Sequence, residues 1–257
     1  MSDTLFHSQH GEDALILQVI GTSGYFVEVG ALEGVQLSNT FDLEGAGWTG
    51  LLIEAHPMLF AQMQTNRPNA QLAHAAVGET DGELTFYGVE SGSLSTFDRD
   101  QRDYFIKNRS GVTLDSYTEY KVRAATLTTL LTEVGAPAVI DMMSIDIEGA
   151  ELPALRGLDF GAFDIRVLIV EKDDARAKQG IETQVAELLH AKGYELARRI
   201  GANDFWTRDP ALRDKIRNAH LKASLQSGAV VDMAPGVNST KRSFWRRIKD
   251  SAKKRLG

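Results

Sequence analysis

Short apolar segments alternate with segments of helical spacing along most of this 257-residue chain. Apolar runs predict buried strands at 25–29, 51–53, 73–77, 141–147 and 165–170. Helical spacing predicts helices at 12–20, 38–44, 58–64, 126–134 and 181–192. Parallel strands need crossover connections that cover the sheet, and helices supply them. The sequence therefore predicts one α/β domain with a mostly parallel sheet and helices on both faces.

Other segments complete or interrupt this pattern. We expect a hairpin strand at 83–87 and further strands at 121–124, 194–200 and 204–207. Residues 98–120 are polar without a clear period, and we interpret them as an insertion and a candidate lid. Residues 211–226 look helical. The predicted organisation is a main domain at 1–209, a helix and linker at 210–240, and a basic amphipathic tail at 241–257.

The charge is unevenly distributed along the chain. The formal net charge is -7, yet residues 241–257 hold eight Lys and Arg against the single acid Asp250. The remaining 240 residues therefore carry a net charge of -14. Binding of a nucleic-acid phosphate backbone needs clustered Lys and Arg. The net negative charge of residues 1–240 therefore argues against an enzyme that acts on nucleic acid.

The chain has no cysteine, which excludes disulfides, thiolate catalysis and Cys-ligated zinc. Residues 1–13 lack the apolar core of a signal peptide, and no apolar run approaches the length that spans a bilayer. We therefore expect a cytoplasmic protein.

The basic tail carries an apolar stripe at three- and four-residue spacing, formed by Phe244, Trp245, Ile248, Ala252 and Leu256. This composition suits a helix on anionic lipid. A solvated tail and an arm that docks on an acidic partner are the alternatives. The tail is thus a candidate peripheral contact with the inner face of the membrane.

An acid and two glycines follow the first predicted strand, in Glu28-Val29-Gly30-Ala31-Leu32-Glu33-Gly34. Glycine lets a backbone approach a ligand closely because it has no Cβ. The spacing differs from the G-x-G-x-x-G fingerprint of nicotinamide and flavin binders, since Leu32 replaces its second glycine. It suits a sulfonium amino acid and its ribose, with Glu28 near the cationic methionine moiety. A plain strand turn is the alternative.

Glu54 ends the second predicted strand, 20 residues after Gly34. An acid at this place hydrogen-bonds the hydroxyls of a ribose in dinucleotide-binding folds. A solvated carboxylate at a strand end is the alternative. NAD binders share this acid, so the glycine spacing, and not Glu54, separates the cofactors.

Asp146 and Glu148 lie at the carboxyl end of the strand predicted at 141–147, and the two-residue spacing places them on one face. Neighbouring carboxylates raise one another's pKa and so provide a general base, or together they hold a divalent cation. Capping of a helix that begins near Glu151 is the structural alternative. We choose Asp146 as the group that accepts a proton.

Further ionisable side chains lie near these positions. Glu171 and Asp173 follow the strand at 165–170 and are expected at the same cleft, where loop charges are the alternative. We expect none of the histidines considered to be the catalytic base; they are His7, His10, His56 and His74, the last within a predicted buried strand.

Five segments, in order along residues 8–208, together resemble the FkbM family of methyltransferases. They are Ser8-Gln9-His10-Gly11-Glu12-Asp13, Phe26-Val27-Glu28-Val29-Gly30-Ala31, Leu37-Ser38-Asn39-Thr40, Gly47-Trp48-Thr49-Gly50-Leu51-Leu52-Ile53-Glu54 and Ser144-Ile145-Asp146-Ile147-Glu148-Gly149-Ala150-Glu151. The combination is far more specific than any single motif.

The resemblance implies a Rossmann-like class I methyltransferase with a seven-stranded sheet and S-adenosylmethionine as cofactor. The candidate cofactor contacts are Glu28, Gly30, Ala31, Gly34, Asn39, Glu54, Ala55, Ala76, Val77 and Asp146, with Ala76 and Val77 beside the adenine. The candidate catalytic residues are Asp146, Glu148 and Glu171. Members of the family commonly methylate hydroxyls, so the expected acceptor is a sugar, a glycan or a secondary metabolite.

Two other classes of function remain open from the sequence. One is a NAD-dependent or nucleotide-sugar enzyme on a similar fold, against which the missing glycine counts. The other is a non-catalytic interaction module whose functional part is the basic tail. A divalent metal is compatible with the acidic residues, but no motif indicates one.

Overall fold

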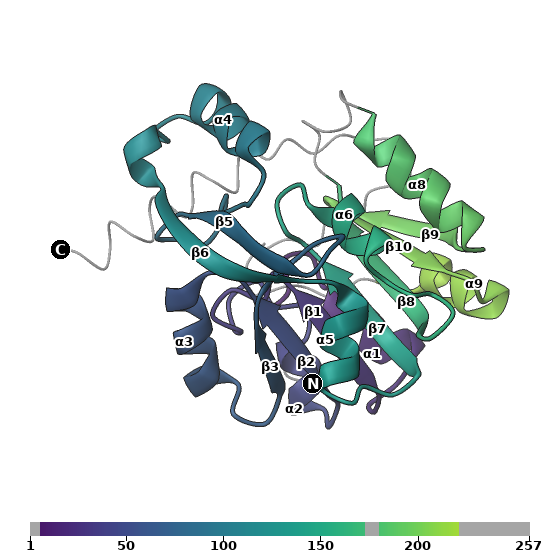
Figure 1. The fold of residues 1–257 in the computed structure, drawn as a ribbon. Helices are drawn as coiled ribbons and strands as arrows, with labels where there is room; N and C mark the ends of the chain where they lie inside the picture. Colours follow the sequence, from purple (N-terminus) through teal and green to yellow (C-terminus); the bar gives the residue numbers. More distant parts are fainter. Residues whose placement is uncertain (1–5, 173–179, 221–257) are drawn as a thin grey trace.

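The computed structural model describes residues 6–172 and 180–220. Its main sheet has seven strands in the spatial order β3-β2-β1-β7-β8-β10-β9 (Figure 1). They are β1 (Tyr25–Val29), β2 (Thr49–Glu54), β3 (Gln71–His74), β7 (Val139–Ile145), β8 (Asp164–Glu171), β9 (Glu195–Ile200) and β10 (Asn203–Thr207). The first five strands in this spatial order, β3, β2, β1, β7 and β8, are parallel to one another, and β10 is antiparallel to both of its neighbours. The predicted fold class is therefore confirmed.

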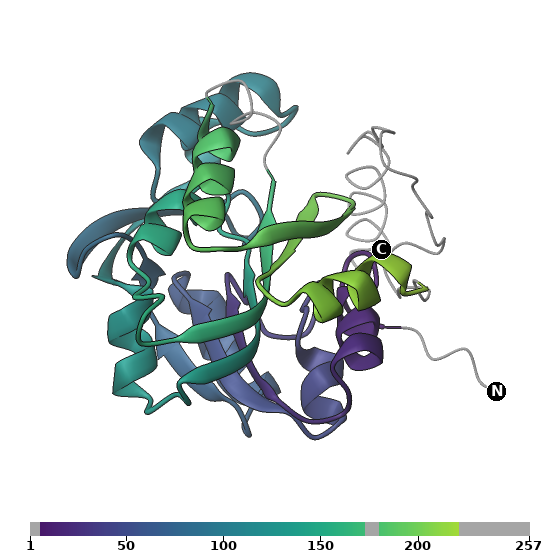
Figure 2. The same ribbon diagram turned by 90° about the vertical axis from the view of Figure 1, so that its right-hand side faces the viewer.

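Helices cover both faces of this sheet. One face packs against α1 (Glu12–Val19), α2 (Phe41–Gly45), α3 (Pro57–Asn66) and α9 (Pro210–Asn218). The other face packs against α5 (Leu127–Glu133), α6 (Glu151–Arg156) and α8 (Ile181–Ala191). Figure 2 shows α9 beside α1 on the first face.

Side chains along each strand point alternately to the two faces of the sheet, so the core is divided into two parts, one on each face. In β1, Phe26 packs with the α1 side, whereas Val27 and Val29 pack with the α5 side. Successive strand residues point to opposite faces, so a strand buried on both sides is continuously apolar. This is why the apolar run at 25–29 predicts β1 with its observed bounds.

Local sequence fixes where several helices begin. His56 caps α3, because its side chain accepts from the backbone N–H of Met58, and Pro57 occupies the first helical position. Asp209 accepts from the N–H groups of Ala211 and Leu212 at the start of α9. Such caps satisfy backbone donors that have no partner inside the helix.

A second sheet, in the order β4-β6-β5, lies beside the carboxyl end of β2. Its strands are β4 (Ala76–Val77), β5 (Gly82–Gly88) and β6 (Thr118–Ala125). The single strand predicted at 73–77 is therefore wrong. The chain leaves the main sheet at Ala75, whose N–H donates to the carbonyl of Glu54, and joins the smaller sheet.

The interpretation of 98–120 as an irregular insertion is also wrong. It contains α4 (Arg99–Asn108), a short 3-10 helix (Leu114–Ser116) and the start of β6. Asp98 caps α4 through the N–H groups of Asp100 and Gln101. Only three side chains of α4 are buried, so the sequence carries almost no apolar period there.

Two further expectations need correction. Strand β7 ends at Ile145, and Glu148 has a left-handed φ of 49°, so Asp146 and Glu148 lie in a turn and do not share a strand face. His74 is exposed, because β3 is the edge strand, and its ring stacks on Phe60 at 4.7 Å.

Other features concern the ends of the chain. In the two described ranges, no helix has the length and apolar character to cross a bilayer. Helix α9 ends at Asn218, and the rest of the helix predicted at 211–226 lies partly outside the described residues. The tail at 241–257 lies wholly outside them.

Candidate functional site

The order of the main sheet identifies the place where a ligand is expected to bind. From β1 the chain continues to β2 on one side, while β7 lies on the other side of β1. In open α/β sheets, ligands bind at the carboxyl ends of the strands where the order reverses in this way. The N–H of Asp146 donates to the carbonyl of Val29 at 3.1 Å, which joins the ends of β7 and β1.

The glycine turn after β1 packs tightly against protein atoms. Gly30 has a φ of 83°, and a Cβ there would overlap the carbonyl oxygen of Asp146. The N–H groups of Gly30 and Ala31 both donate to the carbonyl of Ile53. A Cβ on Gly34 would lie 2.7 Å from Cγ of Arg67. The turn is thus fixed against β2, β7 and α3, and its contact with a cofactor stays a prediction.

Glu54 holds the same turn from the end of β2. Its carboxylate accepts from the N–H of Leu32 at 2.8 Å and from the N–H of His56 at 2.7 Å. Burial raises its pKa to about 7, although these hydrogen bonds oppose the shift. Leu32 has a left-handed φ of 52°, a conformation that costs a leucine energy and that a fixed hydrogen bond helps to maintain.

Glu28 organises the loop that follows the turn. Its carboxyl group accepts from the hydroxyls of Ser38 and Thr40 and from the N–H of Asn39, at 2.8, 2.5 and 2.6 Å. Burial raises the pKa of Glu28, while the nearby positive charge of Arg67 opposes the shift. Both carboxyl oxygens are therefore used to position the loop, and a direct contact of Glu28 with methionine stays a prediction.

Asn39 carries an unsatisfied acceptor at this place. Its amide nitrogen donates to the hydroxyl of Ser144 in β7 at 2.8 Å. Its side-chain oxygen Oδ1 is buried and has no hydrogen-bond partner. A buried acceptor without a partner is costly, so it indicates a donor that residues 6–172 and 180–220 do not provide.

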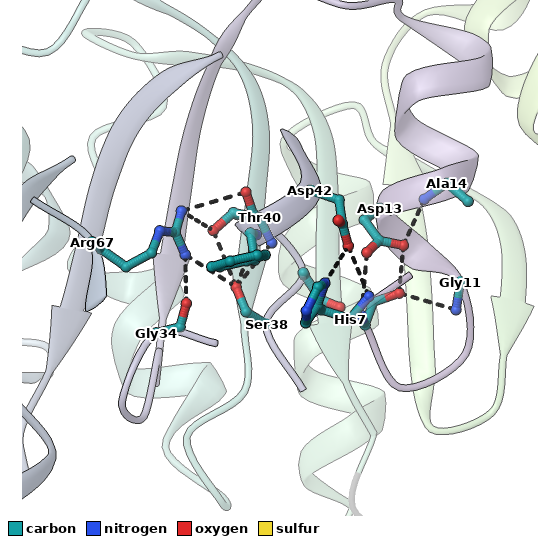
Figure 3. A network of polar contacts seen from close by, with 12 residues as sticks. His7, Gly11, Asp13, Ala14, Gly34, Ser38, Thr40, Asp42 and Arg67 are labelled. Carbon is teal, nitrogen blue, oxygen red and sulfur yellow. Dashed lines mark hydrogen bonds and ion pairs between the residues drawn. The ribbon is translucent and has the colours of Figure 1, made fainter. Parts of the chain in front are cut away.

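Arg67, at the end of α3, is a structural residue that the sequence did not reveal. Its guanidinium is buried and donates to Glu44. It also donates to Gly34 and to the loop residues Ser38 and Thr40 (Figure 3). The guanidinium also lies over the rings of Phe26 and Phe41, at 5.6 Å from each centroid. Its hydrogen-bond partners are 23 to 33 residues away in sequence, so no local motif predicts them.

Four carboxyl groups gather at the ends of β7 and β8; they belong to Asp146, Glu148, Glu151 and Glu171. Burial raises the pKa of Asp146 well above its usual range, and the neighbouring acids and a hydrogen bond with Glu171 add to the shift. Burial and the charge of Glu171 likewise raise the pKa of Glu151 to about 7. The structure thus brings the three candidate catalytic residues together.

The role of Glu151 differs from that of its neighbours. Its side chain accepts from the N–H groups of Ile147 and Gly149, at 3.2 and 3.0 Å, and so holds the turn between β7 and α6. Neither Asp146 nor Glu148 occupies the N-cap position of α6, which is Ala150. Among the described residues, no three His, Asp or Glu side chains are arranged to hold a metal ion.

The remaining candidate cofactor residues lie near Glu54. Ala55 follows it, and the carbonyl of Ala55 is hydrogen-bonded to Nε2 of His74 at 3.1 Å. Ala76 and Val77 are buried in β4, directly after the residue whose N–H donates to the Glu54 carbonyl. Their position beside an adenine stays a prediction.

The histidines take structural places. Burial lowers the pKa of His56, whose neutral ring caps α3 and packs near Phe86 and Tyr120. His7 bonds to Asp42, and His10 packs against Gly201. Asp173 lies outside the described residues.

Comparison with known proteins adds the following similarities. The sequence matches the model of the methyltransferase FkbM domain over residues 28–196. Methyltransferase 1 of Beauveria bassiana (strain ARSEF 2860) is 29% identical over 161 residues, which are 58% of this chain and 64% of that protein. The matched part of this chain thus spans less than two thirds of that relative.

Solved structures show distant likeness. A TehB-like SAM-dependent methyltransferase from Corynebacterium glutamicum has a TM-score of 0.42 and 12% identity, and the match covers 79% of this chain and 89% of that chain. Fibrillarin from Aeropyrum pernix, with bound S-adenosyl-L-methionine, has a TM-score of 0.40 and 11% identity, with 80% and 82% covered.

Proposed function

Since this chain belongs to the FkbM methyltransferase family and its cofactor is S-adenosylmethionine, we propose that it methylates a hydroxyl oxygen of a sugar, glycan or secondary metabolite. The observation that carries the proposal is the carboxyl group of Asp146, which lies at the switch point between β1 and β7 with a raised pKa. Family membership also disfavours the NAD-dependent and non-catalytic alternatives.

The residues present fit the cofactor. The unpartnered Oδ1 of Asn39 would accept from the methionine ammonium, which is a hydrogen-bond donor. The Glu54 carboxylate would accept from the ribose hydroxyls. Ala76 and Val77 would border the adenine with apolar surface. The bound cofactor supplies an electrophilic methyl carbon attached to a positively charged sulfur.

Asp146 would receive the proton in the transfer. As the acceptor oxygen forms its bond to the methyl carbon, the carbon–sulfur bond breaks with its electron pair going to sulfur, and the hydroxyl proton passes to Asp146. The raised pKa of Asp146 favours this, because a carboxylate with a raised pKa binds a proton more strongly than an ordinary carboxylate. Asp146 is hydrogen-bonded to Glu171. When the two groups share a single proton, the pair still contains one carboxylate that can accept the hydroxyl proton.

The charge of the site supports a neutral acceptor. The ionised members of the acidic cluster, which contains Asp146, Glu148, Glu151 and Glu171, would repel a phosphate or carboxylate placed at the reacting atom. A hydroxyl carries no charge and can donate to a carboxylate. Orientation of the two reactants against each other can supply a large part of the rate, about 7 to 11 kcal/mol of the barrier.

The experiment that tests this proposal identifies the bond that forms. The protein is incubated with S-adenosylmethionine labelled with 13C in the methyl group and with a deproteinised extract of the organism in which the protein naturally occurs. Carbon–proton correlation NMR then distinguishes methyl groups on oxygen from those on nitrogen, sulfur or carbon. We expect protein-dependent signals of O-methyl groups. Transfer to nitrogen or carbon alone would refute the proposal.

A peripheral membrane contact through residues 241–257 is a separate proposal, and it rests on their sequence because they lie outside the described residues. The apolar stripe and eight basic residues suit an anionic lipid surface. Co-sedimentation with vesicles containing phosphatidylserine should be lost when 241–257 are deleted. Failure of the full chain to sediment would dismiss the contact.

A further inference from the structure

The segment from His7 to Asp13 precedes the matched family domain, which begins at residue 28. It nevertheless lies against the loop that carries Asn39. Ser8 forms an isolated parallel bridge with Leu37. The backbone N–H of His7 donates to Asp42, and the ring nitrogen Nδ1 of His7 lies 2.9 Å from the same carboxylate oxygen.

Asp13 is the buried centre of this contact. Its carboxyl group accepts from the hydroxyl of Ser8 at 2.6 Å and from the N–H of Ala14 at 2.7 Å, and it is hydrogen-bonded to the carboxyl group of Asp42. The side chain has no exposed surface, and burial raises its pKa to about 8. At neutral pH, Asp13 therefore keeps a proton that it can donate to Asp42.

The 37–42 loop, whose last two residues begin α2, is consequently held from two sides (Figure 3). Asp13 and His7 fix Asp42, and Ser8 fixes Leu37. On the other side, Arg67 binds Ser38 and Thr40. Asn39 lies between these anchors, with its unpartnered oxygen and its bond to β7.

We propose that Asp13 is a positioning residue for the cofactor, which sets the affinity for S-adenosylmethionine by holding the loop that carries Asn39. The inference rests on the assignment of Asn39 to the cofactor site. Asp13 does not itself have to touch the cofactor, since its bonds run to the protein residues Ser8, Ala14 and Asp42. Asp13 would therefore act on cofactor affinity through the position of the loop, and not through a reaction of its own.

Two replacements of Asp13 test whether its hydrogen bonds set the affinity for the cofactor. In Asp13→Ala, Asp42 loses one of its donors and keeps the bonds to His7, and we expect the dissociation constant of S-adenosylhomocysteine to rise by about tenfold or more. In Asp13→Asn, the amide can still donate to Asp42 and accept from Ser8, so affinity should return to within about threefold of the unchanged protein. Isothermal titration calorimetry measures both constants.

Glu12→Ala is the matched control. Glu12 is the neighbouring residue, equally buried, and it accepts from Asn203 in β10 at 2.7 Å and from the N–H of His10 at 2.7 Å. Within the described residues, the hydrogen bonds of the Glu12 side chain run to His10 and Asn203 and not to the 37–42 loop. Glu12→Ala should lower the melting temperature as Asp13→Ala does, while the dissociation constant stays within about threefold. Equal loss of affinity in both variants would overturn the proposal.

Asn39→Ala distinguishes failure of this inference from failure of the cofactor assignment. If Asn39→Ala weakens binding and Asp13→Ala does not, the positioning role is wrong. If neither changes the affinity, the placement of Asn39 at the cofactor is wrong as well. If Asp13→Ala does not fold, Ser8→Ala removes the 2.6 Å bond to Asp13, together with the acceptor of the Gly11 N–H, and should weaken binding in the same direction. Unchanged binding in Ser8→Ala would then overturn the proposal.

Discussion

A Cβ on Gly30 would overlap the carbonyl oxygen of Asp146, so the ends of β1 and β7 approach each other more closely than any residue other than glycine allows. The positive φ of Gly30 adds a second requirement for glycine. The turn proposed to bind the cofactor and the proposed base are thereby joined through backbone atoms. Displacement of either one moves the other.

Gly30→Ala should therefore destabilise the protein and weaken binding of the cofactor together. Because the overlap is with backbone, which cannot rotate away, we expect a loss of about 2 kcal/mol or more in the free energy of unfolding. Urea unfolding and calorimetry with S-adenosylhomocysteine measure the two effects. Gly45→Ala is the control, since a Cβ there meets open space at the end of α2. A stable, cofactor-binding Gly30→Ala would show that the close approach is dispensable.

Stability should fall as the pH rises from 5 to 8. Asp13 and the two glutamates Glu54 and Glu151 have pKa values of about 8, 7 and 7, against ordinary values of 3.8 and 4.5. Between the ordinary and the raised pKa, the folded state holds a proton that the unfolded chain has released. Each group then lowers the free energy of unfolding by up to about 1.4 kcal/mol per pH unit.

The midpoint of urea unfolding, measured at several pH values, checks this dependence. Well above the Asp13 pKa of about 8, these groups are ionised in both states, so their contribution to the slope ends. Asp13→Asn removes one of the three titrations and should give a shallower decline. A midpoint that rises between pH 5 and 8 would contradict the burial of these carboxyl groups in protonated form.

Cofactor binding should have the opposite pH dependence. The ribose hydroxyls donate to the ionised form of Glu54, whose pKa is about 7 without the cofactor. Below that pH the group must first lose its proton, so affinity for S-adenosylhomocysteine should weaken by up to about tenfold per unit. Calorimetry at pH 6 and pH 8 tests this. Glu54→Gln cannot titrate and should bind weakly at both pH values; a pH-independent wild-type affinity would argue against the ribose role.

Arg67 should be indispensable for the loop at 37–42. Arg67→Met leaves Glu44 without its cation and removes one donor from each of the hydroxyls of Ser38 and Thr40, so we expect a loss of about 3 to 5 kcal/mol in the free energy of unfolding. Arg67→Lys should rescue little, because one ammonium cannot reach the separate acceptors of the guanidinium. Urea unfolding measures the loss.

The control for this prediction is an exposed ion pair. Arg123 contacts Glu133 at the surface, with both side chains about half exposed. Arg123→Met should change the unfolding midpoint little, because water already solvates both charges. A similar midpoint for the Arg67 and Arg123 variants would mean that the buried network does not stabilise the loop.

The sequence predicted the main sheet because its strands are buried on both faces and leave continuous apolar runs. Residues 25–29 and 165–170 are examples, and both lie in the strands that the structure contains. The acids after these strands came together because parallel strands end at one edge of the sheet. Helix α4 was not predicted, since it buries only three side chains and has no continuous apolar face.

The supporting network was beyond prediction for a different reason. Arg67 bonds to Gly34 and Glu44, and Asp13 bonds to Asp42, across separations that only the completed fold closes. Nothing in the local sequence around Arg67 indicates that its guanidinium is buried. The strand predicted at 73–77 failed similarly, because the division at Ala75 depends on where β6 lies.

The central claim is that Asp146 accepts the proton during methyl transfer to a hydroxyl. The most direct test compares single-turnover rates of the unchanged protein and Asp146→Asn on an acceptor identified by 13C labelling, with affinity for S-adenosylhomocysteine measured alongside. We predict that the rate falls by about 100- to 10,000-fold, as loss of a general base requires, while affinity stays within about threefold. An Asp146→Asn protein that turns over at the original rate would contradict the claim.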